Sequence, residues 1–155
     1  MKYLVALLIA LLITTSALSA HEHHAPHGGT LVELGEEFAH LELVLDPGTG
    51  TLTGYALDGE AENPVRIEQG DIELRITAVN TQGEEASKTT YILNLEAVPD
   101  VLTGETVSDT SEFTAQSDKL KRAQSFDGVI SAIKIKGEKF NDVEFKFPEG
   151  NEGEK

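Results

Sequence analysis

The sequence predicts an all-β fold built from antiparallel strands, a β-sandwich with one short helix at most. Two observations predict it: apolar residues recur with period two over most of the chain, and turn-forming Gly, Pro, Asn and Asp separate these stretches at short intervals. Seven or eight short strands with almost no helix are typical of two antiparallel sheets packed face to face. A small closed barrel would show the same periodicity and stays open as an alternative.

The first strands are expected between residues 30 and 57. A row of three leucines alternates with His40 and Glu42, so these two side chains should project from the face opposite the leucines. The leucines are Leu41, Leu43 and Leu45. The turn at residues 46–50 then separates this strand from Thr51–Leu57, as in a hairpin with a loop of a few residues.

The second half of the chain continues the pattern. Further strands are expected at residues 71–79 and 91–95, from Phe113, around 133–136 and at 143–147. Residues 100–111, rich in Thr, Ser, Gly and Asp, read as a connecting loop. Residues 117–123 predict one or two helical turns, because Ser117 or Asp118 can cap the free backbone N–H groups.

The N-terminus has the pattern of a signal peptide over residues 1–20. An apolar run from Leu4 to Ile13 is too short to cross a bilayer and is followed by small residues. Cleavage is expected after Ala17 or Ala20, and Ala20 is preferred because the composition changes there. A periplasmic or secreted protein without membrane insertion is therefore expected. After the signal peptide we expect a His-rich segment at residues 21–29, one β-sandwich domain at 30–148 and a disordered tail at 149–155.

Composition excludes several classes. The chain has no cysteine, so neither a disulfide scaffold nor a lipid anchor on a terminal cysteine is expected. With 27 acidic and 12 basic residues the formal charge is −15 at pH 7. Because a polyanion repels the phosphate backbone, nucleic acid is not an expected partner. No nucleophile motif or distinctive carboxylate pair occurs, so the protein is not expected to be an enzyme.

The histidines carry the strongest functional signal. Four of the five in the chain fall in the run His-Glu-His-His-Ala-Pro-His-Gly-Gly: they are His21, His23, His24 and His27. Imidazole is a good ligand for Cu(II), Zn(II) and Ni(II), and a segment that Pro26 keeps from forming a helix can wrap several rings around one ion. The zinc-protease pattern His-Glu-x-x-His fails, because Ala25 stands where the second histidine should be.

Cleavage before His21 would open two further geometries that use the free terminal amine. In one, the amine, two backbone nitrogens and the His23 ring form a four-nitrogen plane, which suits Cu(II) and Ni(II). In the other, His21 chelates copper through its own amine and ring, and a second histidine, for which His40 is the candidate, completes the site. The alternative for the segment is a disordered leader that scavenges metal weakly, and for His40 an ordinary surface residue. Gly28 and Gly29 predict a turn with positive φ.

Two stretches carry a family resemblance: His27 to Gly35, reading His-Gly-Gly-Thr-Leu-Val-Glu-Leu-Gly, and His40 to Asp46. They resemble the His-Gly-Gly periplasmic domain at the front of adaptor subunits of cobalt/zinc/cadmium-type RND efflux systems and in small stand-alone exported proteins. The chain is also similar to small periplasmic copper carriers, which are β-sandwiches that begin with histidine. The resemblance implies His27 and His40 as the matching positions, an Ig-like or copper-carrier-like sandwich, and an RND efflux adaptor or another periplasmic protein as partner.

The leading hypothesis is therefore a periplasmic transition-metal binding protein for buffering or delivery of Cu(II), Zn(II) or Ni(II). The rival is an exported structural or interaction domain whose His-rich segment is incidental. A copper-dependent redox enzyme is a third reading, and it lacks an aromatic substrate surface.

Overall fold

The computed structural model describes residues 23–84 and 86–151, and within them it confirms the all-β prediction. Eight strands follow one another: β1 (Thr30–Leu34), β2 (Ala39–Asp46), β3 (Thr51–Leu57), β4 (Asp71–Thr81), β5 (Tyr91–Ala97), β6 (Glu112–Gln116), β7 (Ala123–Ile135) and β8 (Glu138–Phe147). A single 3-10 turn, η1 (Asp118–Leu120), precedes β7. The predicted signal peptide and His21 lie outside the described residues.

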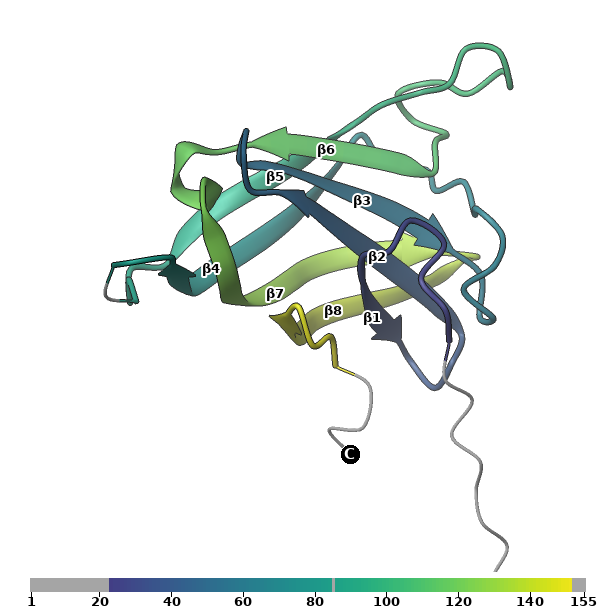
Figure 1. Cartoon of the computed structure of the whole chain (residues 1–155). Helices are drawn as coiled ribbons and strands as arrows, with labels where there is room; N and C mark the ends of the chain where they lie inside the picture. The colour runs from purple at the N-terminus through teal and green to yellow at the C-terminus, as the bar shows by residue number, and fades with distance from the viewer. Residues whose placement is uncertain (1–22, 85, 152–155) are drawn as a thin grey trace, which may run out of the picture.

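The strands form one antiparallel sheet in the order β1-β2-β3-β6-β5-β4-β7-β8. The sheet rolls until its first and last strands come together, so that it is nearly closed (Figure 1). Hydrogen bonds between side chains and backbone span this seam: the Thr30 hydroxyl donates to Pro148 O at 3.0 Å, and the Asn151 side chain bonds both N and O of Glu33. Asn151, which follows β8, thus joins the end of β8 to β1, although these two strands do not pair directly.

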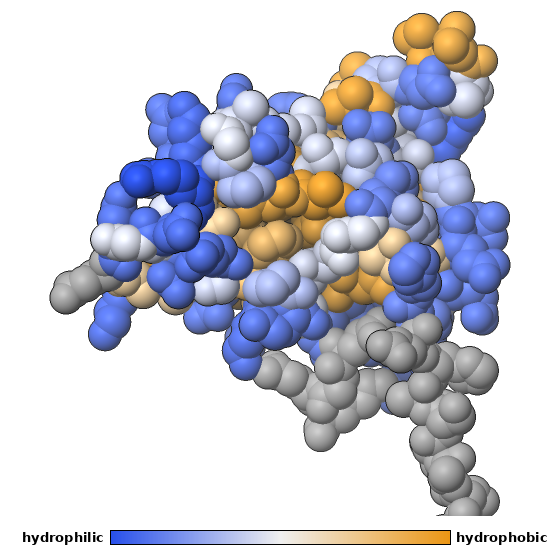
Figure 2. All heavy atoms as spheres, in the orientation of Figure 1, coloured by the Kyte–Doolittle hydropathy of each residue, from blue (hydrophilic) through white to orange (hydrophobic). Residues whose placement is uncertain are grey.

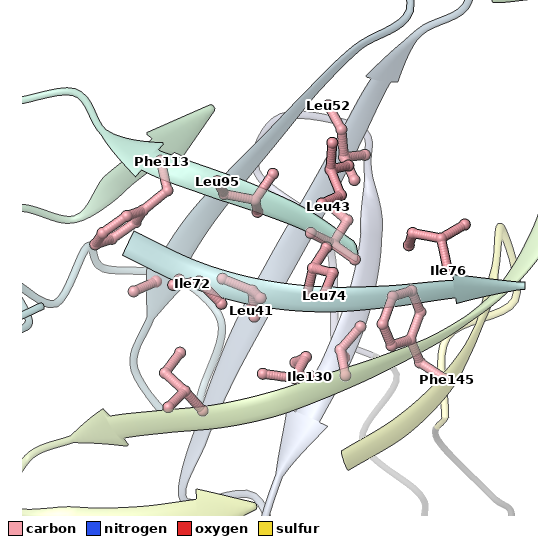
Figure 3. Close-up of a cluster of buried hydrophobic side chains, with 14 of the residues drawn as sticks. Leu41, Leu43, Leu52, Ile72, Leu74, Ile76, Leu95, Phe113, Ile130 and Phe145 are labelled. Carbon is pink, nitrogen blue, oxygen red and sulfur yellow. The ribbon is translucent and has the colours of Figure 1, made fainter. Parts of the chain in front are cut away.

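The core lies between the two halves of the rolled sheet. Leu41 and Leu43 of β2 meet Ile72 and Leu74 of β4 across the interior, and Phe113 of β6 belongs to the same cluster (Figure 3). These side chains are fully buried. The period-two pattern of the sequence therefore marks the inner face correctly, as expected when alternate residues point to opposite sides of a strand. With no disulfide, apolar burial is the main stabilising term.

The connecting segments agree with the sequence except at the C-terminal end. Residues 98–111 form the predicted loop, and Ser117 caps η1 by accepting a hydrogen bond from Lys119 N at 3.3 Å. Residues 149–151, which the sequence assigns to a disordered tail, instead turn back on β8, with Gly150 at φ +82°. No helix in the described part of the chain is long and apolar enough to cross a membrane.

Candidate metal centre

The outer face of β2 carries two polar side chains that are completely buried, His40 and Glu42, each 0% exposed. They alternate with Leu41 and Leu43, so the predicted facing of this strand is confirmed. Two polar side chains on the outer face of a sheet would ordinarily be exposed to solvent. Here it is covered, because the segment at residues 23–29 folds back over β2 (Figure 1).

Glu42 holds that segment down. Its Oε1 accepts hydrogen bonds from the backbone N–H groups of His27 at 2.8 Å and Gly29 at 2.9 Å. The chain reaches this position through a turn in which Gly28 N donates to Ala25 O at 3.0 Å. Gly28 adopts φ +70°, as the sequence predicts. A buried carboxylate needs such donors, because an ionised group without partners is strongly disfavoured in an apolar environment.

Gly29 is required for a different reason from its neighbour. A Cβ at this position would lie 2.6 Å from Leu43 O and 2.8 Å from the Val44 side chain, which is too close for any other residue. Gly29 therefore lets the backbone lie directly against β2. The sequence predicts a positive φ at both glycines; at Gly29 this prediction is wrong, and the constraint there is close approach to the strand.

The His27 ring is fixed by two contacts. Its Nδ1 lies 2.7 Å from Glu42 Oε2, and its plane stacks on the Tyr55 ring with the centroids 3.8 Å apart and an interplanar angle of 14°. Tyr55 is opposite Glu42 in the β2–β3 register. An ionised carboxylate can only accept, so Nδ1 carries the proton and donates it. In the neutral ring Nε2 then holds the lone pair, on the edge away from Glu42, as in the carboxylate–histidine pairs that orient metal ligands.

His40 is oriented in a similar way by a backbone carbonyl. Its Nδ1 lies 3.1 Å from Asp58 O, in the turn that follows β3. A carbonyl oxygen accepts, so Nδ1 is the donor, and in the neutral ring Nε2 carries the lone pair. The ring of His23 lies beside that of His40, with the centroids 4.7 Å apart and the planes inclined by 59°.

This separation fits two imidazoles on one ion. A ring nitrogen lies about 2.0–2.1 Å from a bound Zn(II), so the ring centroid is about 3.2 Å from the ion. For ligands at angles of about 90–109°, the square and tetrahedral values, two centroids would then lie about 4.5–5.2 Å apart. The observed spacing of His23 and His40 falls in this interval.

The other predicted ligands are not part of this pair. His24 is exposed, and no ring contact of the described residues involves it. His21 lies outside the described residues. Among residues 23–84 and 86–151, no group of three or more His, Cys, Asp or Glu side chains is arranged to hold a metal ion. A complete coordination shell around His23 and His40 would thus need donors from elsewhere.

The surroundings of His27 favour cations. A cleft of about 370 Å³ opens beside the ring, and its walls include Tyr55, Glu105 and Glu112. Four acidic residues line it, and none of the described lining residues is a lysine or arginine. Burial raises the pKa of Tyr55, and the negative charges of Glu112 and Glu42 raise it further, so the phenol stays neutral.

Alternation along β2 predicts the correct face for Glu42, but the sequence assigns this residue no role and does not point to Tyr55 or the Asp58 carbonyl. The i, i+2 spacing of His40 and Glu42 was the available signal for Glu42. Tyr55 and Asp58 become neighbours only through the β2–β3 register and the following turn, which have no sequence signature.

Comparison with known proteins adds no relative. The chain matches no family model, no curated protein and no solved structure.

Proposed function

We propose that this is an exported, periplasmic protein that binds one Cu(II), Zn(II) or Ni(II) ion for buffering or delivery. His40, on the outer face of β2, and His23, in the N-terminal segment that covers this face, supply two imidazole ligands. Donors that precede His23, namely the ring of His21 and the terminal amine released by cleavage after Ala20, complete the shell. His27, more exposed and oriented by Glu42, offers a further imidazole at the mouth of the acidic cleft. The association with a metal efflux system rests on the family resemblance alone.

One observation carries this proposal: the His23 and His40 rings lie 4.7 Å apart although 17 positions separate them in sequence. If the N-terminal histidines were incidental, the ring of one of them would not be expected to pack against a buried histidine. Metal-binding histidines commonly donate their second ring nitrogen to a carbonyl or carboxylate, and both His40 and His27 have such a partner. His27 of the N-terminal segment and His40 of β2 are thus both held in a defined tautomer.

Isothermal titration of the mature protein with each metal tests the proposal, with two alanine variants compared. Losing even a group that orients a ligand costs about 10–100-fold in metal affinity, so His23→Ala should weaken binding by at least about tenfold. His24→Ala is the matched control, because it removes an adjacent histidine whose ring contacts no other ring in residues 23–84 and 86–151, and it should bind as the wild type does. Equal affinities for all three proteins would contradict the proposal.

A further inference from the structure

The β5–β6 loop, residues 98–111, carries an unusual group of exposed aliphatic side chains. Val101 is 77% exposed, Leu102 93% and Val107 60%. The loop projects beyond the ends of the strands (Figure 1), and in the matching orientation its tip is a hydrophobic knob (Figure 2). Burying a large aliphatic side chain is favourable, so a cluster held in water points to an interaction surface.

Hydrogen bonds within the loop fix its shape. Glu105 accepts from Asp100 N at 3.0 Å and from the Thr110 hydroxyl at 2.7 Å. Arg66, outside the loop, donates to Thr103 O at 2.6 Å. The loop therefore presents its apolar tip in a defined conformation, and little conformational entropy remains to be lost when a partner binds.

The charge around the tip is negative. The loop contains Asp100, Glu105 and Asp109 and has no lysine or arginine of its own. Arg66, outside the loop, forms ion pairs with Glu105 and Asp109, each at 3.5 Å, so the loop keeps a net negative charge. The whole chain carries −15, so a second copy or an anionic membrane would be repelled. A protein surface that is apolar at its centre and rimmed by lysine and arginine complements the tip in both respects.

The loop also borders the metal-binding region. Asp100, Thr103 and Glu105 line the same cleft as His27. A partner that takes up the tip would therefore lie over the cleft and close to the His27 ring, where an ion could pass between the proteins.

We propose that the β5–β6 loop is the docking element for a basic protein with an apolar pocket, and that this partner exchanges metal with the protein. The exchange rests on the proposed function, whereas the docking does not. Val101 and Leu102 fill the pocket. The exposed carboxylate of Asp100 and the partly exposed carboxylate of Asp109 face its basic rim.

Site-specific photo-crosslinking in the cells that produce the protein tests the docking. A photo-reactive amino acid replaces Leu102 in one version and Ile92 in the other. Ile92, on β5, is the matched control, because it is 51% exposed and lies outside the loop. The expected result is one main protein adduct at position 102, absent at 92, whose crosslinked peptide contains apolar residues near lysine or arginine.

The adduct is then identified and the partner purified for binding measurements. The double variant Val101→Ser/Leu102→Ser should bind it about tenfold or more weakly, as expected for central anchors, and Ile92→Ser should bind it like the wild type. Added salt should weaken the wild-type complex. An adduct with a second copy or with lipid, sedimentation with phosphatidylethanolamine/phosphatidylglycerol vesicles, or unchanged binding of the double variant would each overturn the proposal.

A metal titration of the same double variant keeps the two proposals apart. Its affinity should equal that of the wild type, because neither substitution touches His23 or His40. Loss of docking with intact metal binding would overturn this inference alone. Docking without metal binding in the wild type would overturn the proposed function and leave the docking surface standing.

Discussion

Glu42 is the residue on which the arrangement of the N-terminal segment depends. It is a buried carboxylate whose two oxygens accept from two backbone N–H groups and one imidazole. A charge in such a position is tolerated only with partners of this kind. The same contacts attach residues 27–29 to β2 and select the tautomer of His27.

The isosteric substitution Glu42→Gln should reverse that tautomer. The amide oxygen can still accept the N–H groups of His27 and Gly29, but the amide nitrogen would face His27 Nδ1 and donate to it. In the neutral ring the proton would then move to Nε2, and His27 could no longer bind a metal through that atom. A two-bond ¹H–¹⁵N spectrum of the histidine rings reads the tautomer directly.

Glu112→Gln is the control for this experiment. It removes a negative charge from the same cleft without touching the hydrogen bonds of His27. The His27 tautomer should stay as in the wild type. The same His27 tautomer in the Glu42→Gln and Glu112→Gln variants would mean that the orienting role of Glu42 is wrong.

At the scale of elements, β2 serves the core and the candidate site at once. Its leucines pack inside the rolled sheet, and its polar residues face the returning N-terminal segment. The β5–β6 loop is the second element of functional interest. Its conformation depends on Glu105, which joins both ends of the loop through Asp100 and Thr110.

The loop should contribute stability that depends on pH. Burial raises the pKa of Glu105, but hydrogen bonds from Asp100 N, Thr110 and Ser111 and the charge of Arg66 outweigh it, so the pKa lies below its ordinary value of 4.5. Folding thus favours the ionised carboxyl. The contribution is present above pH 4.5 and is lost as the pH falls through the lowered pKa.

Urea unfolding of the wild type and Glu105→Gln over a pH series checks this. The wild type should be the more stable protein at pH 7, and the difference in free energy of unfolding should narrow as the pH falls below 4.5. Glu96→Gln, at an exposed position of β5, is the control. A difference for Glu105→Gln that stays constant down to the acid range would refute the role of the ionised carboxyl.

For the molecule as a whole, periodicity in the sequence predicts the strands well, because alternate burial leaves a direct mark on composition. The alternating apolar residues of β2, such as Leu41, and of β4, such as Ile72, lie in the core as expected. The order of strands in one rolled sheet is not predictable in this way, since β3 pairs with β6 across more than fifty residues of intervening chain.

The candidate site was predictable only in part. Residue chemistry pointed to the histidines, and alternation placed His40 on the outer face of β2. Its complete burial could not be foreseen, because it results from residues 23–29 lying over the strand. Likewise the exposed aliphatic tip at Val101 and Leu102 reads in sequence as an ordinary polar loop.

The central claim is that two imidazoles far apart in the chain act on one ion, and histidine ¹⁵N spectroscopy of the mature protein tests it most directly. Addition of one equivalent of Zn(II), which is diamagnetic, should shift a ring nitrogen of His23 together with Nε2 of His40, while the ring nitrogens of His24 keep their positions. Unchanged His23 and His40 signals at one equivalent, or equal shifts at His24, would contradict the account.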